Sequence, residues 1–119
     1  MTYEDLLIVK YKDNGRDYDG MDCYGLVLEL CARAGTPLRD IVYSGNHEKE
    51  WADNDYIASL NVEERNWAEQ GFVVQCTYAG RLHIGYLVNK KTVVHMTYEG
   101  VRVSPLAALQ NVKIYEVIA

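Results

Sequence analysis

One cysteine and two histidines in this 119-residue chain have the types and spacing needed for nucleophilic catalysis. Cys23 begins a segment with helical hydrophobic periodicity, and His83 and His95 lie in a part of the chain rich in strand-forming residues. A thiol becomes a strong nucleophile when a nearby base removes its proton. The three residues therefore predict an acyl-transfer site in which Cys23 attacks, His83 accepts the thiol proton and His95 orients His83.

The nucleophile is predicted to stand at the start of a helix that runs from Cys23 to about residue 34. Asp22 is a favoured N-cap residue, and Gly35 with Pro37 supplies the stop signal. The apolar residues of the segment fall on one stripe, which consists of Leu26, Val27, Leu30, Cys31 and Ala34. The helix dipole is expected to favour the thiolate, and the N–H of Cys23 is the natural oxyanion donor. A buried structural cysteine is the alternative.

The two histidines are predicted to lie on neighbouring strands joined by a short turn. If the turn is centred on Asn89, His83 and His95 stand directly opposite each other, with Cβ atoms about 4.5–5.5 Å apart. They would then face the helix that carries Cys23, and Gly85 would leave room beside them for a substrate chain. The alternative is two ordinary strand histidines. The third histidine, His47, lies in a polar stretch and is expected at the surface.

Composition excludes several classes of protein. The net charge of −5 and the lack of a Lys/Arg cluster argue against nucleic-acid binding. Three cysteines without a CxxC pair argue against a disulfide framework and a zinc site, so reduced thiols and no metal or cofactor are expected. Cys31 and Cys76 are expected in the core. The N-terminal apolar run of four residues follows acidic residues, so we expect no signal peptide, no membrane segment and synthesis in the cytoplasm.

The pattern of elements predicts an α+β fold in a single domain, residues 1–119. A short helical segment is expected at residues 3–9, a loop at 11–21, and weak helical patterns near 48–59 and 62–69, the second with Asn61 and Glu64 as a capping pair. Four or five antiparallel strands follow, with the helices on one face of the sheet. The strand patterns span residues 72–78, 82–88, 92–98, 101–103 and 112–118.

Three short motifs together resemble the NlpC/P60 papain-like cysteine peptidases. They are Gly20-Met21-Asp22-Cys23-Tyr24-Gly25-Leu26-Val27, His83-Ile84-Gly85 and Val94-His95. The resemblance covers nearly the whole chain and is greatest to the phage tail-assembly members. It implies a papain-like fold with a four- to six-stranded antiparallel sheet. It also implies hydrolysis of amide bonds in peptidoglycan stem peptides, typically between D-γ-glutamyl and a diamino acid.

The resemblance also assigns roles to individual residues. Cys23 matches the nucleophile, His83 the base and His95 the third polar residue. Tyr11 matches a tyrosine near the nucleophile that assists the oxyanion or the substrate, and Asp22 matches a residue that holds the substrate's free amine. Tyr24 stands where housekeeping members commonly have Ser, so we expect the substrate preference of this chain to show there.

Three functions are compatible with this pattern. The first is a peptidoglycan amidase carried by a phage or prophage tail, with other tail proteins as partners and the cell wall as its site of action. The second is a contact-delivered amidase toxin, which would pair with an immunity protein. The third is a catalytically inactive structural module of a tail tip. Trp51 and Trp67 are expected to pack against the sheet, and Tyr18 either packs or lines a cleft.

Overall fold

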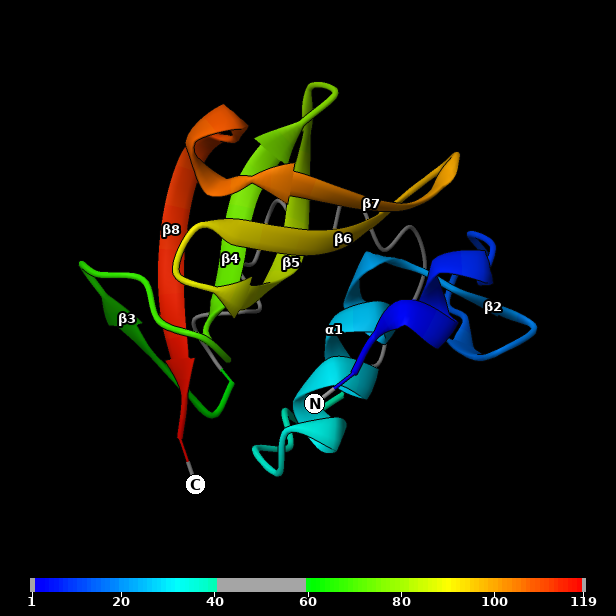
Figure 1. Cartoon of the computed structure of the whole chain (residues 1–119), viewed down its shortest axis with the longest axis horizontal. Helices are drawn as coiled ribbons and strands as arrows, with labels where there is room; N and C mark the ends of the chain where they lie inside the picture. Colours follow the sequence, from blue (N-terminus) through cyan, green and yellow to red (C-terminus); the bar gives the residue numbers. More distant parts are fainter. Residues whose placement is uncertain (1, 41–59, 119) are drawn as a thin grey trace.

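The chain forms an α+β fold with one α-helix and a six-stranded antiparallel sheet among the residues described (Figure 1). The structure is a computed structural model that describes residues 2–40 and 60–118. The elements are η1 (Glu4–Ile8), β1 (Arg16–Asp17), β2 (Gly20–Met21), α1 (Cys23–Arg33), β3 (Val62–Arg65), β4 (Val73–Tyr78), β5 (Arg81–Asn89), β6 (Thr92–Thr97), β7 (Gly100–Pro105), η3 (Leu106–Ala108) and β8 (Gln110–Val117).

Local sequence signals fix both ends of α1. The Asp22 side chain accepts a hydrogen bond from the N–H of Gly25 at 2.7 Å, as an N-cap residue does. At the other end Gly35 has φ +78°, and the N–H groups of Gly35 and Thr36 donate to the carbonyls of Ala32 and Cys31. This pair of bonds is a Schellman motif, which needs a residue that tolerates a left-handed conformation. The predicted helix is confirmed.

The large sheet has the strand order β3-β8-β4-β5-β6-β7, and each neighbouring pair is antiparallel. Irregular pairing interrupts the β4–β8 ladder near Gln75 and the β5–β6 ladder between Leu87 and Asn89. Such bulges bend a sheet. Figure 1 shows the result, in which β6 and β7 run across β4, β5 and β8.

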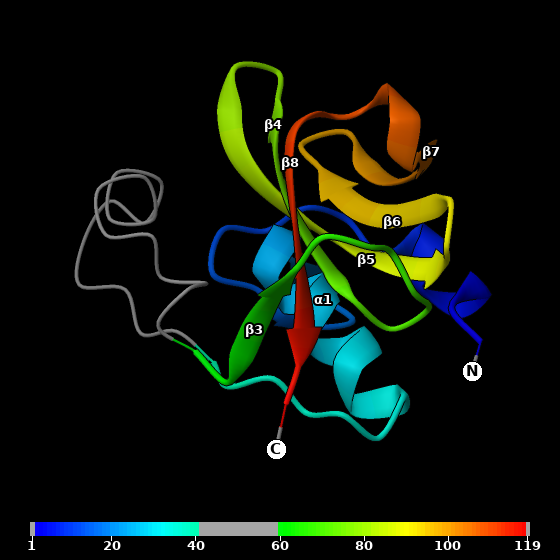
Figure 2. The same cartoon turned by 90° about the vertical axis from the view of Figure 1, so that its left-hand side faces the viewer.

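The bent sheet has a separate hydrophobic cluster on each face. Side chains that alternate along β5 and β6, such as Ile84 and Met96, pack with α1 in the larger cluster. The opposite face holds a smaller cluster of Phe72, Val74, Cys76, Leu87 and Val93. In Figure 2, α1 lies behind β8 and β3, on one side of the sheet. His83 and His95 alternate with Ile84 and Met96 along these strands, so they do not belong to the larger cluster.

The helical pattern predicted at 62–69 has a different structure, whereas the short helical segment predicted at 3–9 is confirmed. Residues 62–65 form β3, which pairs with β8, rather than the start of a helix at 62–69. Asn61 does not cap a helix, because its side chain accepts from the N–H of Arg39 and donates to the carbonyls of Pro37 and Ile118. These bonds to distant parts of the chain hold the residue that directly precedes β3, a strand at the edge of the large sheet. The segment at 3–9 is a 3-10 helix, Glu4–Ile8.

Part of the predicted middle section lies outside the described residues. This part comprises the helical pattern near 48–59, His47 and Trp51. In the segments that are described, no helix is both long enough and apolar enough to cross a membrane.

Candidate active site

A short hydrogen bond joins the two histidines on β5 and β6. Nε2 of His83 lies 2.9 Å from Nδ1 of His95. The prediction that the two residues stand directly opposite was wrong, because the register pairs Tyr86 with Val94 and Leu87 with Val93. Continued along the strands, this register places His95 opposite Gly85. The rings meet diagonally, which long side chains on one face can do.

Gly85 makes room for β6 rather than for a substrate. A Cβ atom at this position would lie 2.5 Å from Cγ1 of Val93 and 3.2 Å from Cβ of His95. The space beside the glycine is therefore already filled by the neighbouring strand. The expectation that Gly85 leaves a place for a substrate chain is corrected accordingly.

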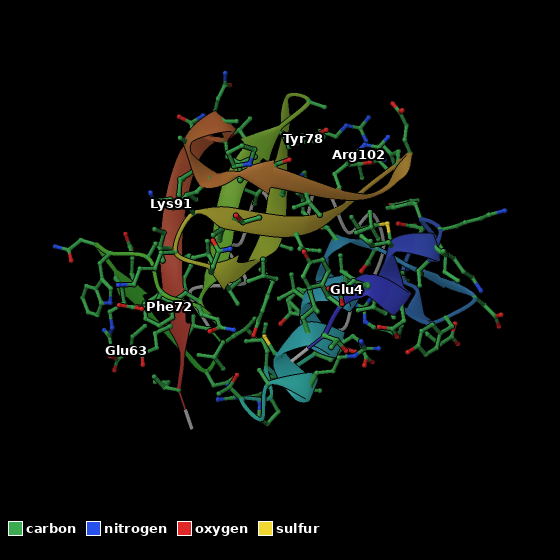
Figure 3. All side chains as sticks on the ribbon, viewed as in Figure 1. Glu4, Glu63, Phe72, Tyr78, Lys91 and Arg102 are labelled. Carbon is green, nitrogen blue, oxygen red and sulfur yellow. The ribbon has the colours of Figure 1, made fainter. Side chains whose placement is uncertain are left out.

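Two residues that the sequence did not single out complete the surroundings of the histidines. Nε2 of His95 lies 2.8 Å from the hydroxyl oxygen of Ser104 on β7. The ring of Tyr78, labelled in Figure 3 at the end of β4, lies 5.1 Å from the His83 ring and 5.0 Å from the His95 ring. Tyr78 lay within the predicted strand 72–78, but its neighbours depended on a register that the sequence did not fix, and Ser104 lay one residue beyond the predicted strand 101–103.

Burial keeps both imidazoles neutral at neutral pH. His95 is fully buried and His83 is 8% exposed. Burial lowers the pKa of His83 to about 3, and the neighbouring His95 acts in the same direction. Burial also lowers the pKa of His95 to about 4, with the guanidinium of Arg102 as a smaller cause. A neutral imidazole donates through one nitrogen and accepts through the other, so the pair shares one proton in its hydrogen bond.

Cys23 is the first residue of α1 and is half-buried. Burial raises the pKa of its thiol to about 12, and the adjacent Asp22 carboxylate adds to this shift. The backbone N–H groups of Ile84, Tyr24 and Cys23 act in the opposite direction but are weaker. The expectation that the helix start favours the thiolate is therefore corrected. The resting side chain is the thiol.

The thiol meets β5 through the main chain of Ile84, the residue next to His83. Ile84 belongs to the cluster that packs with α1, and His83 alternates with it along β5. The expected approach of the imidazoles to Cys23 stays a prediction. In the described part of the chain, no hydrogen bond joins the Cys23 thiol to His83. Because Nε2 of His83 is bonded to His95, Nδ1 is the nitrogen left for the thiol proton.

Asp22 is part of the frame that holds Cys23. The carboxylate is 2% exposed, and its Oδ1 accepts from the N–H of Gly25 and from Nη1 of Arg16 at 2.8 Å. Arg16 also binds the carboxylate of Asp40 and the carbonyl of Gly15. Oδ2 of Asp22 is buried and has no hydrogen-bond partner among the described residues. The structure thus places the predicted amine-binding residue beneath the surface, beside an arginine.

Tyr24 and Tyr11 have different positions. Tyr24 is completely buried, and its hydroxyl donates to the carbonyl of Arg39, so the structure places it in the core rather than at a substrate surface. Tyr11 is half-buried and lies close enough to Cys23 for the two to interact electrostatically. Burial is the main cause of its raised pKa, followed by Asp13, to which its hydroxyl donates at 3.3 Å.

An aromatic and basic rim lies next to Tyr11. The ring of Tyr11 contacts the ring of Tyr98 edge-on, with the two ring centroids 4.6 Å apart. Tyr98 is 55% exposed, and the guanidinium of Arg81 lies over its ring at 5.1 Å and donates to its hydroxyl. Arg81 begins β5, two residues before His83. The rim therefore connects the neighbourhood of Cys23 with the strand that carries His83.

Other reactive side chains lie in the core. Cys31, on α1, is buried in the larger cluster, and Cys76, on β4, is buried in the smaller one; all three cysteines are free. Across residues 2–40 and 60–118, no group of three His, Cys, Asp or Glu side chains is placed to hold a metal ion.

Comparison with known proteins adds no assignment. No protein-family model matches the chain, and no curated protein matches it significantly.

Proposed function

We propose that this chain is a cysteine peptidase or amidase in which Cys23 is the nucleophile, His83 the general base and His95 the residue that orients the base. The observation that carries the proposal is the 2.9 Å bond from Nε2 of His83 to Nδ1 of His95. This bond occupies Nε2 of the His83 imidazole and leaves Nδ1 as the nitrogen that can accept the thiol proton. A base held by a third group is the arrangement that thiol and serine hydrolases share.

The resting state in this proposal is a neutral thiol and a neutral imidazole, as the raised pKa of Cys23 and the lowered pKa of His83 require. When a substrate carbonyl binds, Sγ attacks its carbon while Nδ1 of His83 takes the thiol proton. The imidazolium then donates through Nε2–H to His95. An apo structure need not contain the Cys–His bond, because such bonds often tighten only in the substrate complex.

The remaining steps use the same groups. The N–H of Cys23, at the first turn of α1, has no partner within the helix and can donate to the oxyanion. His83 returns its proton to the leaving amine, and the C–N bond breaks to give a thioester on Cys23. His83 then takes a proton from water, whose oxygen attacks the thioester. Collapse of the second intermediate releases the carboxylic acid and restores the thiol.

We propose peptidoglycan stem peptides as the substrate, cut between D-γ-glutamyl and a diamino acid, with the protein carried by a phage or prophage tail. The resemblance of the Cys23, His83 and His95 motifs to NlpC/P60 peptidases supports this choice. The α+β architecture is compatible with it. Stem peptides carry carboxylates, for which Arg81 beside Tyr98 provides a suitable partner at the rim.

Digestion of purified sacculi tests the proposal. We expect the wild type to release muropeptide fragments and Cys23→Ala to release none. Cys31→Ala is the matched control, because it removes a buried thiol from α1 about two turns away from Cys23. Mass analysis of fragments from a defined muropeptide identifies the bond that is cut. Equal release by wild type and Cys23→Ala, or no release by either, contradicts the proposal.

One observation favours a second function, a catalytically inactive structural module. The Cys23–His83 bond is not formed in the described residues, and burial holds the thiol in its unreactive form. A protein that keeps the fold only would bind other tail proteins with unchanged affinity when Cys23 is replaced by Ala. The sacculus experiment separates the two functions, because only the enzyme loses its activity in that variant.

A further inference from the structure

Ser104 ends the chain of hydrogen bonds that begins at His83. Its hydroxyl oxygen lies 2.8 Å from Nε2 of His95, whose Nδ1 lies 2.9 Å from Nε2 of His83. We propose that Ser104 is a positioning residue: by accepting a hydrogen bond from His95, it holds His83 in the tautomer whose Nδ1 carries no proton. The choice of this proton arrangement over its reverse rests on the proposed function, and the tautomers themselves can be measured without any activity.

The positions of the protons follow from the chemistry required at Nδ1 of His83. A neutral imidazole carries one proton, so an unprotonated Nδ1 means a proton on Nε2. That proton is donated to Nδ1 of His95, which must then be the unprotonated nitrogen of its ring. The proton of His95 is consequently on Nε2, and it points at Ser104. A hydroxyl oxygen can accept it.

The reverse arrangement uses the same heavy atoms and disables the base. Ser104 would donate to Nε2 of His95, and Nδ1–H of His95 would donate to Nε2 of His83. His83 would then carry its proton on Nδ1, where the thiol proton must arrive. Whether Ser104 accepts from His95 or donates to it therefore decides whether Nδ1 of His83 can accept the thiol proton. Ser104 itself contacts neither the thiol nor the substrate.

Strand register and burial make Ser104 the partner on which this tautomer depends. β7 pairs Ser104 with Val93 and Arg102 with His95, so Ser104 lies diagonally beside His95 on the same face. His95 is fully buried, so solvent cannot replace a lost acceptor at its ring. Without the hydroxyl, a proton on Nε2 of His95 is buried and unpaired. The ring then favours Nδ1–H, which is directed at His83.

Imidazole nitrogen NMR tests the assignment without any activity measurement. The full chain is labelled with ¹⁵N-histidine in a His47→Gln background, so that only the two site rings contribute, and is compared with its Ser104→Ala and Ser104→Thr forms. At neutral pH we expect Nε2–H for both rings with Ser104 and with Thr, and Nδ1–H for His95 with Ala. A wild-type His83 protonated on Nδ1, or an unchanged His95 tautomer in Ser104→Ala, overturns the proposal.

Kinetics on a muropeptide substrate give the second readout. We expect Ser104→Ala to lower kcat about tenfold to a hundredfold, by analogy with the loss of the partner that orients a metal-bound histidine, with KM little changed. Ser104→Thr keeps the hydroxyl and should restore most of the activity. Equal kcat for Ser104→Ala and an active wild type overturns the role of Ser104. If no form hydrolyses the substrate, the proposed function fails, and the tautomers measured by NMR still decide the inference about Ser104.

Discussion

His83 and His95 are hydrogen-bonded at 2.9 Å although they are not opposite each other in the β5–β6 ladder. The ladder places His95 opposite Gly85, and the two rings bridge an offset along the strands. This offset has a chemical consequence, because it brings Nδ1 of His95 to Nε2 of His83 and keeps the remaining nitrogen of His83 out of the pair. It also brings Nε2 of His95 to Ser104.

Replacement of His95 tests whether the third residue of the proposed triad matters. In His95→Ala the Nε2–H of His83 loses its acceptor, so the imidazolium is no longer stabilised and its tautomer is no longer fixed. We expect kcat on a muropeptide substrate to fall about 10²–10⁴-fold, the range for general acid–base catalysis. The free energy of unfolding should fall by about 1–3 kcal/mol, because a buried N–H is left unpaired.

The matched variant for this prediction is His95→Gln, whose amide oxygen can accept a hydrogen bond. It should retain more activity and more stability than His95→Ala. Equal kcat in the wild type and in His95→Ala would contradict the assigned role of His95.

The lowered pKa values of the two histidines predict that acid destabilises the protein. The folded pKa values, about 3 for His83 and about 4 for His95, lie below the ordinary value of 6.5. Between these limits the unfolded chain binds more protons than the folded chain, so the free energy of unfolding falls as the pH falls below 6.5. Each histidine contributes a slope of up to about 1.4 kcal/mol per pH unit. Above pH 6.5 neither histidine makes the free energy of unfolding depend on pH, because both are neutral in the folded and the unfolded chain.

Denaturant unfolding between pH 4 and pH 8 measures this effect. The carboxylates also titrate in acid, so the comparison is with the double variant His83→Gln/His95→Gln, in which only the histidine contribution is removed. We expect its free energy of unfolding to depend less steeply on pH than that of the wild type below pH 6.5. Parallel curves for the two proteins would contradict the depressed pKa values.

The sequence predicted the elements whose signals are local. Asp22 and Gly35 mark the ends of α1 through capping bonds made within a few residues. The strand segments after residue 72 carry β-branched and aromatic residues that favour a pleated surface, and the structure has strands in all of them. Cys23 was placed correctly at the first helical position, because the cap before it is a property of neighbouring residues.

The features that were predicted wrongly depend on contacts between distant residues. The register of β5 and β6 follows from a bulge near Asn89, and a one- or two-residue change there moves every cross-strand pair. Asn61 has the type of a helix cap but makes its bonds with Arg39, Pro37 and Ile118. Tyr24 resembles a substrate-facing residue in sequence, yet the helix turns it into the core. Local patterns carry no information about these partners.

The raised pKa of Cys23 predicts slow alkylation of the free protein. With a pKa of about 12, the thiolate fraction near pH 8 is roughly a thousandfold lower than for an ordinary cysteine. We expect iodoacetamide to modify Cys23 more slowly than a free thiol by a comparable factor, with the rate rising as the pH approaches 12. Mass spectrometry of the labelled protein gives the rate at each cysteine.

Asp22→Asn is the informative variant for this measurement. Asparagine still caps the helix, and it removes the negative charge that helps to raise the Cys23 pKa. Alkylation of Cys23 should therefore become faster, while Cys31 and Cys76, whose pKa values are raised by burial alone, should be unaffected. Wild-type Cys23 reacting at the rate of a free thiol at neutral pH would contradict the thiol resting state.

Arg16 is predicted to stabilise the protein by neutralising Asp22. The guanidinium is 26% exposed, whereas the carboxylate is 2% exposed and cannot be solvated once its partner is lost. We expect Arg16→Met to lower the free energy of unfolding by about 1–3 kcal/mol, less than for a fully buried pair because water reaches the arginine. In the double variant Arg16→Met/Asp22→Asn much of the loss should be recovered, because the amide needs no counter-charge. A double variant as unstable as the sum of the single variants would contradict this interpretation.

Gly85 is predicted to be required for the close approach of β5 and β6 that brings His83 and His95 together. In Gly85→Ala the new Cβ would meet Cγ1 of Val93 at 2.5 Å, so one of the strands must shift. We expect a loss of about 1–3 kcal/mol in the free energy of unfolding, as for other overpacked cores, and a weaker hydrogen bond between the imidazoles.

The double variant Gly85→Ala/Val93→Ala removes the obstructing methyl groups and leaves the His95 Cβ at 3.2 Å, a contact that a small shift relieves. It should therefore restore the histidine tautomers seen by NMR even though Val93→Ala alone costs stability by opening a cavity. If Gly85→Ala alone keeps wild-type stability and tautomers, the glycine is not what sets the spacing of the two strands.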